Sequence, residues 1–181
     1  IYERFLDMFI PMVMSLRVGD PLDDSTQIGP VIDEENITRI EEWVNEAKAN
    51  GAKVVTGGKR NGNFYEPTVV TDTDPNMKIS CMEVFGPVVT VEKMSDFEEG
   101  VRSVNNSVYG LQAGVFTDNL KHAFMAFERI EAGGVIINDV PNYRVDHMPY
   151  GGVKMSGFGR EGVRYAIEEM TELKLMALNL R

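Results

Sequence analysis

The chain has 181 residues, 43% of them hydrophobic, which is enough to bury a sizeable core, and we expect one compact unit. Its net charge of −10 would repel a phosphate backbone, so nucleic acid is excluded as an expected partner. No apolar stretch approaches the roughly 20 residues that cross a bilayer, so we expect a soluble, cytoplasmic protein without a membrane partner.

The first half of the chain alternates helical and extended patterns. Apolar residues at helical spacing predict a helix over residues 2–17, kinked at Pro11. A second helix is predicted to begin after its N-cap Asp33 and to end at Gly51. Because the chain begins with Ile1 inside a helical pattern, we expect it to be part of a longer protein. The predicted strands of this half are residues 52–56, 65–71 and 87–92.

The second half continues with a capping box at residues 95–98, which predicts a helix to about residue 105. Asp118 is the predicted N-cap of the next helix, and Gly133 ends that helix. The alternation of strands and helices predicts an α/β fold with a mostly parallel, twisted sheet and crossover helices. The remaining predicted elements are strands at 111–117, 135–138 and 173–178 and a helix at 161–170.

The loop 149–162 contains a Gly-x-Gly-x-x-Gly pattern at Gly157, Gly159 and Gly162. A dinucleotide fingerprint needs a strand that leads into the turn and a βαβ unit with a suitably placed acid. A polar loop precedes these glycines instead. We therefore interpret them as residues of a tight loop that needs positive φ.

Cys81 is the single cysteine, so it excludes an internal disulfide and is the only thiol that could act as a nucleophile. Glu83 disfavours the thiolate, and Lys78 is the only basic side chain nearby in sequence. A thiol enzyme built on Cys81 is therefore the least favoured interpretation. His122 fits a helix face, where a surface or packed imidazole is ordinary, and with two histidines we expect no metal site.

The stretch 83–88 is the most informative one. Glu83 and Phe85 are two residues apart, so they lie on the same side of an extended segment. A carboxylate can accept hydrogen bonds from both hydroxyls of a ribose, and an aromatic ring can pack on the sugar and nicotinamide. Glu83 and Phe85 are therefore candidate cofactor-binding residues.

Five stretches resemble the aldehyde dehydrogenase superfamily in order and spacing. They are Ile28-Gly29-Pro30-Val31-Ile32, Glu83-Val84-Phe85-Gly86-Pro87-Val88, Asn105-Asn106-Ser107-Val108-Tyr109-Gly110-Leu111, Gly133-Gly134-Val135-Ile136-Ile137-Asn138 and the loop 149–162. The resemblance covers the family's C-terminal part, rather less than half of a subunit. It implies a fragment of an NAD- or NADP-dependent oxidoreductase that oxidises an aldehyde to a carboxylic acid through a cysteine thiohemiacetal. The nucleophilic cysteine and the general-base glutamate would precede Ile1, so no catalytic residue is expected in the chain.

The resemblance also implies roles for particular residues. Glu83 would hold the nicotinamide ribose, Phe85 would pack beside it, and Asn36 and Arg39 would approach the cofactor ribose. The main nucleotide-binding domain lies outside the chain, so NAD and NADP stay open.

On the substrate side, Tyr150 matches an aromatic residue of the family's tunnel, and the loop that holds Tyr143, Arg144 and His147 matches the tunnel mouth. A guanidinium and an imidazole at this place favour a small polar or anionic aldehyde. In the alternative interpretation, Arg144 pairs with Asp146 or Asp139 and only holds the loop.

The resemblance divides the chain into residues 1–171, the C-terminal portion of the catalytic domain, and residues 172–181, a strand for oligomerisation. We expect a homo-oligomer, a dimer or tetramer, because such a strand seeks a sheet partner in another subunit. The chain by itself is expected to be inactive. The alternative is a folded, non-catalytic binding or assembly module.

Overall fold

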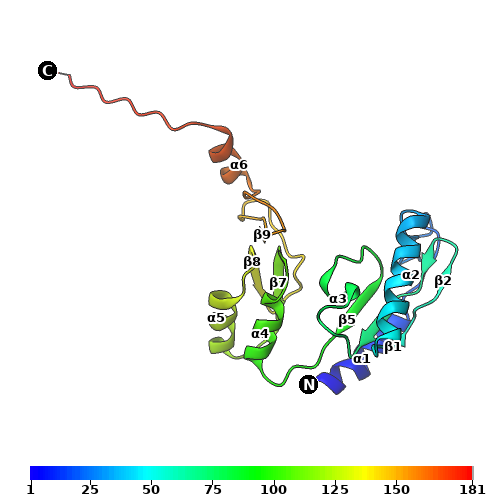
Figure 1. Cartoon of the computed structure of the whole chain (residues 1–181). Coiled ribbons are helices and arrows are strands. Elements are labelled where there is room, and N and C mark those ends of the chain that lie inside the picture. Colours follow the sequence, from blue (N-terminus) through cyan, green and yellow to red (C-terminus); the bar gives the residue numbers. More distant parts are fainter. Residues whose placement is uncertain (181) are drawn as a thin grey trace. The chain divides into compact units, whose positions relative to one another are not determined.

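The computed structural model describes residues 1–180 and divides the chain into two compact units, Ile1–Lys93 and Met94–Arg181 (Figure 1). The expectation of one compact unit was therefore wrong. The chain divides in this way because the buried apolar residues form two separate clusters, one in each unit. Each unit therefore has its own core.

The first unit is built around a three-stranded sheet in the order β1-β4-β5. β4 pairs with β1 in antiparallel fashion and with β5 in parallel fashion, and all four residues of β4 are buried. The elements are α1 (Tyr2–Met14), α2 (Glu34–Ala49), β1 (Lys53–Thr56), β2 (Arg60–Asn61), β3 (Phe64–Tyr65), β4 (Thr68–Thr71), α3 (Lys78–Cys81) and β5 (Val88–Val91).

α2 forms where its N-cap and apolar spacing predicted it. The side chain of Asp33 accepts a hydrogen bond from the amide of Asn36 and so satisfies one free N–H of the first turn. The apolar residues at helical spacing are buried on one face, and Gly51 follows the helix with a φ of +102°. That face is Ile37, Ile40, Val44 and Ala47. α1, by contrast, is shorter than predicted, because it ends at Met14 and not at residue 17. Pro11 lies inside the helix, as predicted.

The second unit contains a crossover of the predicted kind. β7 and β8 pair in parallel, and α5 connects them, while β6 and β9 form a separate antiparallel pair. The α/β class is confirmed, and the sheets are partly rather than mostly parallel. The elements are α4 (Phe97–Asn105), β6 (Tyr109–Gly110), β7 (Gln112–Val115), α5 (Leu120–Arg129), β8 (Gly134–Ile137), β9 (Val153–Lys154) and α6 (Val163–Met170).

Two predicted helix caps lie one residue away from the observed ones. Asp96 caps α4 by accepting from the amide of Glu99, whose carboxylate accepts in turn from the backbone N–H of Ser95 at 2.6 Å. The N-cap therefore lies one residue later than predicted, and the carboxylate of the third helical residue bonds the residue before the N-cap. α5 is capped by Asn119, not by Asp118, because the Asn119 side chain accepts from the amide of Lys121.

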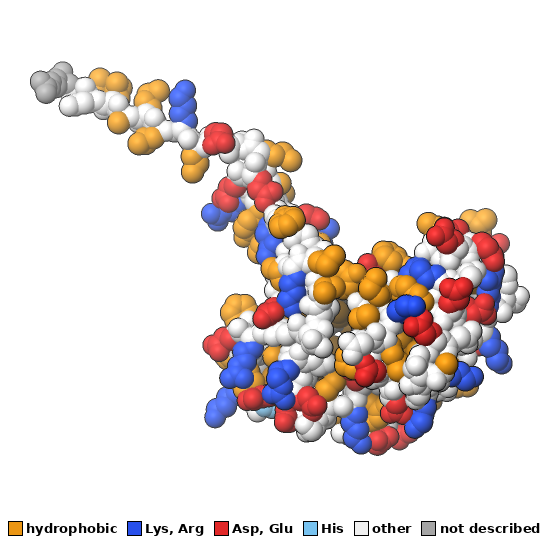
Figure 2. All heavy atoms as spheres, viewed as in Figure 1, with side chains coloured by type: hydrophobic (Ala, Val, Ile, Leu, Met, Phe, Trp, Pro, Cys, Tyr) orange, Lys and Arg blue, Asp and Glu red, His pale blue; other side chains and the backbone are white. Residues whose placement is uncertain are grey.

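Residues 171–180 form neither a helix nor a paired strand (Figure 1). Their leucines are exposed, from 74% at Leu178 to 104% at Leu173, and Figure 2 shows apolar side chains along this segment. A strand needs a partner for its backbone groups. The strand at 173–178 therefore stays a prediction, which requires pairing with another copy of the chain. Residue 181 of the predicted oligomerisation element lies outside the described residues. Within residues 1–180, no helix has the length and apolar character to span a membrane.

Candidate functional site

An open groove of about 450 Å³ in the first unit brings three parts of the sequence together. It is lined by residues 29–32, by Asn36 on α2 and by residues 85–87 before β5. Two of the stretches singled out in the sequence, 28–32 and 83–88, thus face each other across one surface. α2 and β5 position them.

The chain turns sharply beside the groove at Phe85 and Gly86. Phe85 has a φ of +52°, which is uncommon for a residue with a side chain, and its ring is 71% exposed. A side chain at Gly86 would come very close to the Ile40 side chain, so the turn packs closely on α2. The turn therefore rests on the buried core and presents an aromatic ring outward.

Arg39 fastens the same turn from α2. Its guanidinium donates to the carbonyl oxygens of Glu83 at 3.2 Å and Val84 at 3.1 Å. It also donates to the side chain of Asn36 at 2.8 Å, and its Cζ lies 4.8 Å from the centroid of the Trp43 ring. Arg39 therefore holds the backbone of the turn with the fork geometry that a lysine would lack.

Asn36 links this arrangement to the start of α2. Its side-chain amide donates to Asp33 at 2.7 Å, and its backbone N–H donates to the same carboxylate oxygen. These backbone and side-chain hydrogen bonds lower the pKa of Asp33. Asn36 and Arg39, predicted as cofactor contacts, thus form one network with Asp33 and the turn.

Glu83 differs from its neighbours because its carboxylate is exposed and has no hydrogen bond or ion pair with any residue in the described part of the chain. The backbone of Glu83 is held by Arg39, while its acceptor oxygens stay available. An available carboxylate two residues from an exposed aromatic ring is chemically suited to a ligand that offers hydroxyl groups and a flat ring.

The second unit has a smaller pocket of about 230 Å³ in the glycine-rich loop, and it includes Tyr150. Arg144 lies at its edge: its Cζ is 5.0 Å from the Tyr150 ring centroid, and its Nη2 is 2.9 Å from a carboxylate oxygen of Glu161. The alternative interpretation paired Arg144 with Asp146 or Asp139, and the ion pair is with Glu161 instead. The full lining is Leu111, Tyr150, Gly151, Gly152, Ser156, Phe158, Gly159, Arg160, Glu161 and Glu169.

The backbone explains why Glu161 is the partner of Arg144. Tyr150 and Glu161 exchange two backbone hydrogen bonds, of 3.2 and 2.6 Å, and this bridge brings Glu161 next to the ring on which Arg144 lies. Tyr143 and His147 are exposed and do not line this pocket. Of the four predicted substrate residues, the structure brings Tyr150 and Arg144 together.

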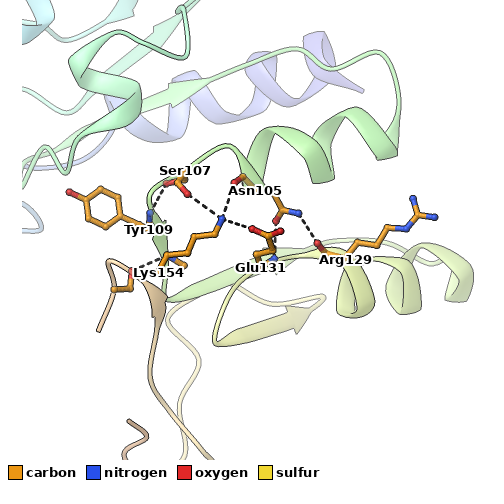
Figure 3. A network of polar contacts seen from close by, with 8 residues as sticks. Asn105, Ser107, Tyr109, Arg129, Glu131 and Lys154 are labelled. Carbon is orange, nitrogen blue, oxygen red and sulfur yellow. Dashed lines mark hydrogen bonds and ion pairs between the residues drawn. The ribbon is translucent and has the colours of Figure 1, made fainter. Parts of the chain in front are cut away.

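The interpretation of the glycine pattern is confirmed, because Gly157, Gly159 and Gly162 have φ values of +115°, +73° and +111°. Sequence reasoning missed Lys154, which stands inside the same loop. Figure 3 shows its ammonium group among three acceptors from residues 105, 107 and 131. The sequence marks this residue only as a lysine within a glycine-rich loop.

Cys81 lies exposed at the end of α3. Its thiol contacts the carbonyl oxygen of Asn76 at 3.7 Å, and within residues 1–180 it has no hydrogen bond with a basic group. Nothing in its surroundings activates it as a nucleophile. His122 stacks on Phe97 with ring centroids 4.3 Å apart, which confirms a packed imidazole.

The fold and these two sites define an α/β protein with one candidate ligand site in each unit. The profile of the aldehyde dehydrogenase family matches residues 1–176, and the chain belongs to this family. It is 51% identical over 180 residues to a 3-sulfolactaldehyde dehydrogenase of Priestia aryabhattai, covering 99% of this chain and 38% of that protein. The chain thus spans well under half the length of this relative.

Two solved structures have the same fold. Aldehyde dehydrogenase 21 from Physcomitrella patens, solved with the reaction product succinate, is 49% identical with a TM-score of 0.92, over 94% of this chain and 36% of that one. Glyceraldehyde-3-phosphate dehydrogenase GapN from Methanocaldococcus jannaschii, solved with NADP, is 38% identical with a TM-score of 0.90, over 95% of this chain and 37% of that one.

Proposed function

We propose that this chain belongs to an NAD(P)-dependent aldehyde dehydrogenase that oxidises an aldehyde to a carboxylic acid through a cysteine thiohemiacetal, with the cysteine outside these 181 residues. Its contribution is the nicotinamide-ribose edge of the cofactor site and one wall of the substrate tunnel. The observation that carries the proposal is the turn at residues 83–85: within the described residues the Glu83 carboxylate has no partner, and Phe85, two residues further on, is exposed at the groove. Arg39 on α2 holds the backbone of this turn.

The chemistry of this edge fits a nicotinamide riboside. The Glu83 carboxylate can accept from two adjacent ribose hydroxyls, and the Phe85 ring offers an apolar face for the sugar and the nicotinamide. Arg39 and Asn36 act mainly by holding these two residues in place, since their polar groups are already engaged. NAD or NADP, when bound, accepts a hydride from the substrate.

Replacement of Glu83 by Gln in the full-length enzyme tests this role. A neutral amide holds the ribose hydroxyls less strongly, so kcat should fall about 10- to 100-fold, mostly in hydride transfer. Glu42→Gln, an exposed carboxylate on α2, is the matched control and should retain wild-type rates. Wild-type rate and cofactor affinity in the Glu83→Gln enzyme would make Glu83 a structural residue.

We further propose that the substrate is a small polar or anionic aldehyde. The names of the similar proteins contain a sulfonate, a phosphate and, as reaction product, a dicarboxylate. Arg144 supports the same class: Glu161 contacts one of its terminal nitrogens, and the planar fork has further donors for a substrate anion.

A matched pair of aldehydes of equal length, 4-oxobutanoate and its neutral amide, measures this preference. A charge-assisted contact in a partly desolvated tunnel is worth about 1.5–3 kcal/mol, which corresponds to a preference of about 10- to 150-fold for the anion. Arg144→Ala should remove that preference. Equal losses of kcat/KM on both aldehydes would mean that Arg144 holds the loop and does not recognise charge.

The isolated chain should oxidise no aldehyde, because it offers no activated nucleophile and only part of the cofactor's contacts. Its thiol should react with iodoacetamide at the rate of an ordinary cysteine. Turnover by the purified chain that disappears in Cys81→Ser would establish the thiol-enzyme alternative instead.

Residues 172–181 are proposed as an assembly element that pairs with a second copy, giving a homo-oligomer. The support is the exposed leucine series of residues 173–180 and the absence of a pairing partner within the described part of this chain. Light scattering should report an oligomer for the chain and a monomer after truncation at residue 171. If the chain formed a folded oligomer and the full-length protein oxidised no aldehyde, the alternative of a non-catalytic assembly module would be favoured.

A further inference from the structure

Lys154 has a backbone conformation that its residue type does not favour. Its φ is +55°, in the left-handed region where glycine is unstrained and a residue with a side chain is not. The loop around it is rich in glycine, yet this position carries a lysine whose side chain is only 24% exposed. Such a conformation persists where the surroundings of the residue hold it in place.

The ammonium group of Lys154 has three oxygen partners, two through hydrogen bonds and one through an ion pair (Figure 3). Nζ donates to the carbonyl oxygen of Asn105 at 2.8 Å and to that of Ser107 at 3.2 Å. The third partner is the carboxylate of Glu131, at 2.9 Å. Asn105 is the last residue of α4, so the cation lies at the helix end where carbonyl groups are free and the helix dipole is negative.

The acceptors of Lys154 are themselves connected. The side chain of Asn105 donates to the carbonyl oxygen of Arg129 at 2.6 Å and accepts from the amide of Glu131 at 2.8 Å. The end of α4 and the end of α5 are therefore tied to each other, and one ammonium group ties both to β9 (Figure 3).

Directly beside the ammonium group, the turn before β6 lies against the glycine-rich loop. The amide of Gly110 donates to the hydroxyl of Ser156 at 2.9 Å, and the amide of Met155 donates to the carbonyl of Val108 at 2.9 Å. A side chain at Gly110 would come within 2.8 Å of Val153. The two segments are thus in direct contact.

These two segments lead into residues that line the pocket of the second unit. Leu111 follows Gly110 on one side, and Gly152 and Ser156 flank β9 on the other. We propose that Lys154 is a positioning residue for this pocket: its ammonium group holds the α4–β6 turn against the glycine-rich loop and so fixes both walls. The assignment of the pocket to substrate rests on the proposed function, whereas the contact itself does not.

Hydrogen exchange on the 181-residue chain tests the contact directly. Lys154→Met keeps the length of the side chain and removes the donors, so exchange at the amides of Gly110 and Met155 should become about 10- to 100-fold faster. Lys154→Arg should retain most of the protection. Lys121→Met, an exposed lysine on α5, is the control and should leave these amides unchanged.

Lys154→Gly separates the side-chain contact from the backbone conformation. Glycine relieves the strain at φ +55° but cannot bridge the two segments, so these amides should lose protection as they do in Lys154→Met. Wild-type protection in Lys154→Gly would overturn the proposal, because the loop would then need only the backbone conformation. Wild-type protection in Lys154→Met would overturn it as well.

Kinetics of the full-length enzyme test the link to the pocket. Lys154→Met should raise the aldehyde KM by about 3- to 10-fold and leave the cofactor KM unchanged, and Lys154→Arg should restore most of the loss. A fall in kcat alone, with both KM values unchanged, would mean that Lys154 only stabilises the unit. An enzyme that oxidises no aldehyde would refute the proposed function, while hydrogen exchange would still decide whether Lys154 holds the two segments together.

Discussion

In the first unit, the groove lies on elements that enclose a cluster of nine buried apolar residues, whereas the cluster of the second unit has three. The turn at Phe85 rests directly on Ile40 in the larger cluster. The pocket at Tyr150 is instead formed by a loop held by a lysine, an arginine and close glycine contacts. Burial of apolar surface thus positions one site, and a few directional contacts position the other.

Gly133 gives the sharpest way to break the second unit. A side chain there would collide with the carbonyl oxygen of Gly151, and backbone on both sides prevents a local adjustment. Gly133→Ala should therefore lower the free energy of unfolding of this unit by about 3–5 kcal/mol. Urea denaturation with hydrogen exchange should show loss of protection in residues 94–170 and none in residues 1–93.

Gly100→Ala is the matched control in the same unit. Gly100 lies within α4, and a side chain there would meet no atom within 4 Å. Alanine should stabilise the helix by about 0.5–1 kcal/mol. If Gly133→Ala were tolerated as well as Gly100→Ala, the close glycine contacts would not be what holds this unit.

Tyr65 makes the stability of the first unit sensitive to alkaline pH. Its side chain is 1% exposed, its hydroxyl has no hydrogen-bond partner in the described residues, and burial raises its pKa to about 12. Because the unfolded chain loses this proton near pH 10, the contribution to stability is complete below pH 10 and is lost as the pH rises toward 12. The loss should reach roughly 2–3 kcal/mol and should be confined to the first unit.

Tyr65→Phe should remove this alkaline loss. At pH 7 it should change the free energy of unfolding by less than about 1 kcal/mol, since the hydroxyl forms no bond that the substitution could break. Urea denaturation at pH 7 and pH 11 measures both effects. Tyr165→Phe in the second unit is the control, and a large loss at pH 7 in Tyr65→Phe would contradict an unpaired hydroxyl.

The two helix caps allow the same substitution in each unit. Asp33→Ala and Asp96→Ala should each lower the melting temperature of their unit by about 2–5 °C, because each removes the acceptor of a first-turn amide. Hydrogen exchange at Asn36 and Glu99 should assign each loss to its own helix. If either substitution made hydrogen exchange faster in both units, the two units would not unfold independently of each other.

The cap of α2 also adds an acid dependence. The hydrogen bonds from Asn36 lower the pKa of Asp33, so its contribution is present above the unfolded pKa near 4 and is lost as the pH falls through the lower folded value. Asp33→Asn keeps an acceptor but not the charge, so it should be slightly less stable than the wild type at pH 7. Circular dichroism melts below pH 4 should then show a smaller decline for Asp33→Asn than for the wild type.

Local patterns in the sequence predicted α2 and the glycine loop because their causes are local. Asp33 caps the helix that directly follows it, and Gly157 has a positive φ that a glycine adopts without strain. The contacts of Lys154 with Asn105 and of Arg144 with Glu161 join residues far apart in the chain, so no neighbouring pattern indicates them. The stretch 83–88 could be selected by its chemistry, but the turn at Phe85 depends on its contact with α2.

If the segment after α6 pairs with a second copy, as proposed, protein concentration becomes a variable of every measurement on this chain. An apolar segment with unpaired backbone groups gains free energy when copies associate, and association follows mass action. Melting temperatures of the chain should therefore rise with concentration, whereas those of a chain truncated at residue 171 should not. Stability values for either unit are properties of the fold only when they are extrapolated to dilute solution.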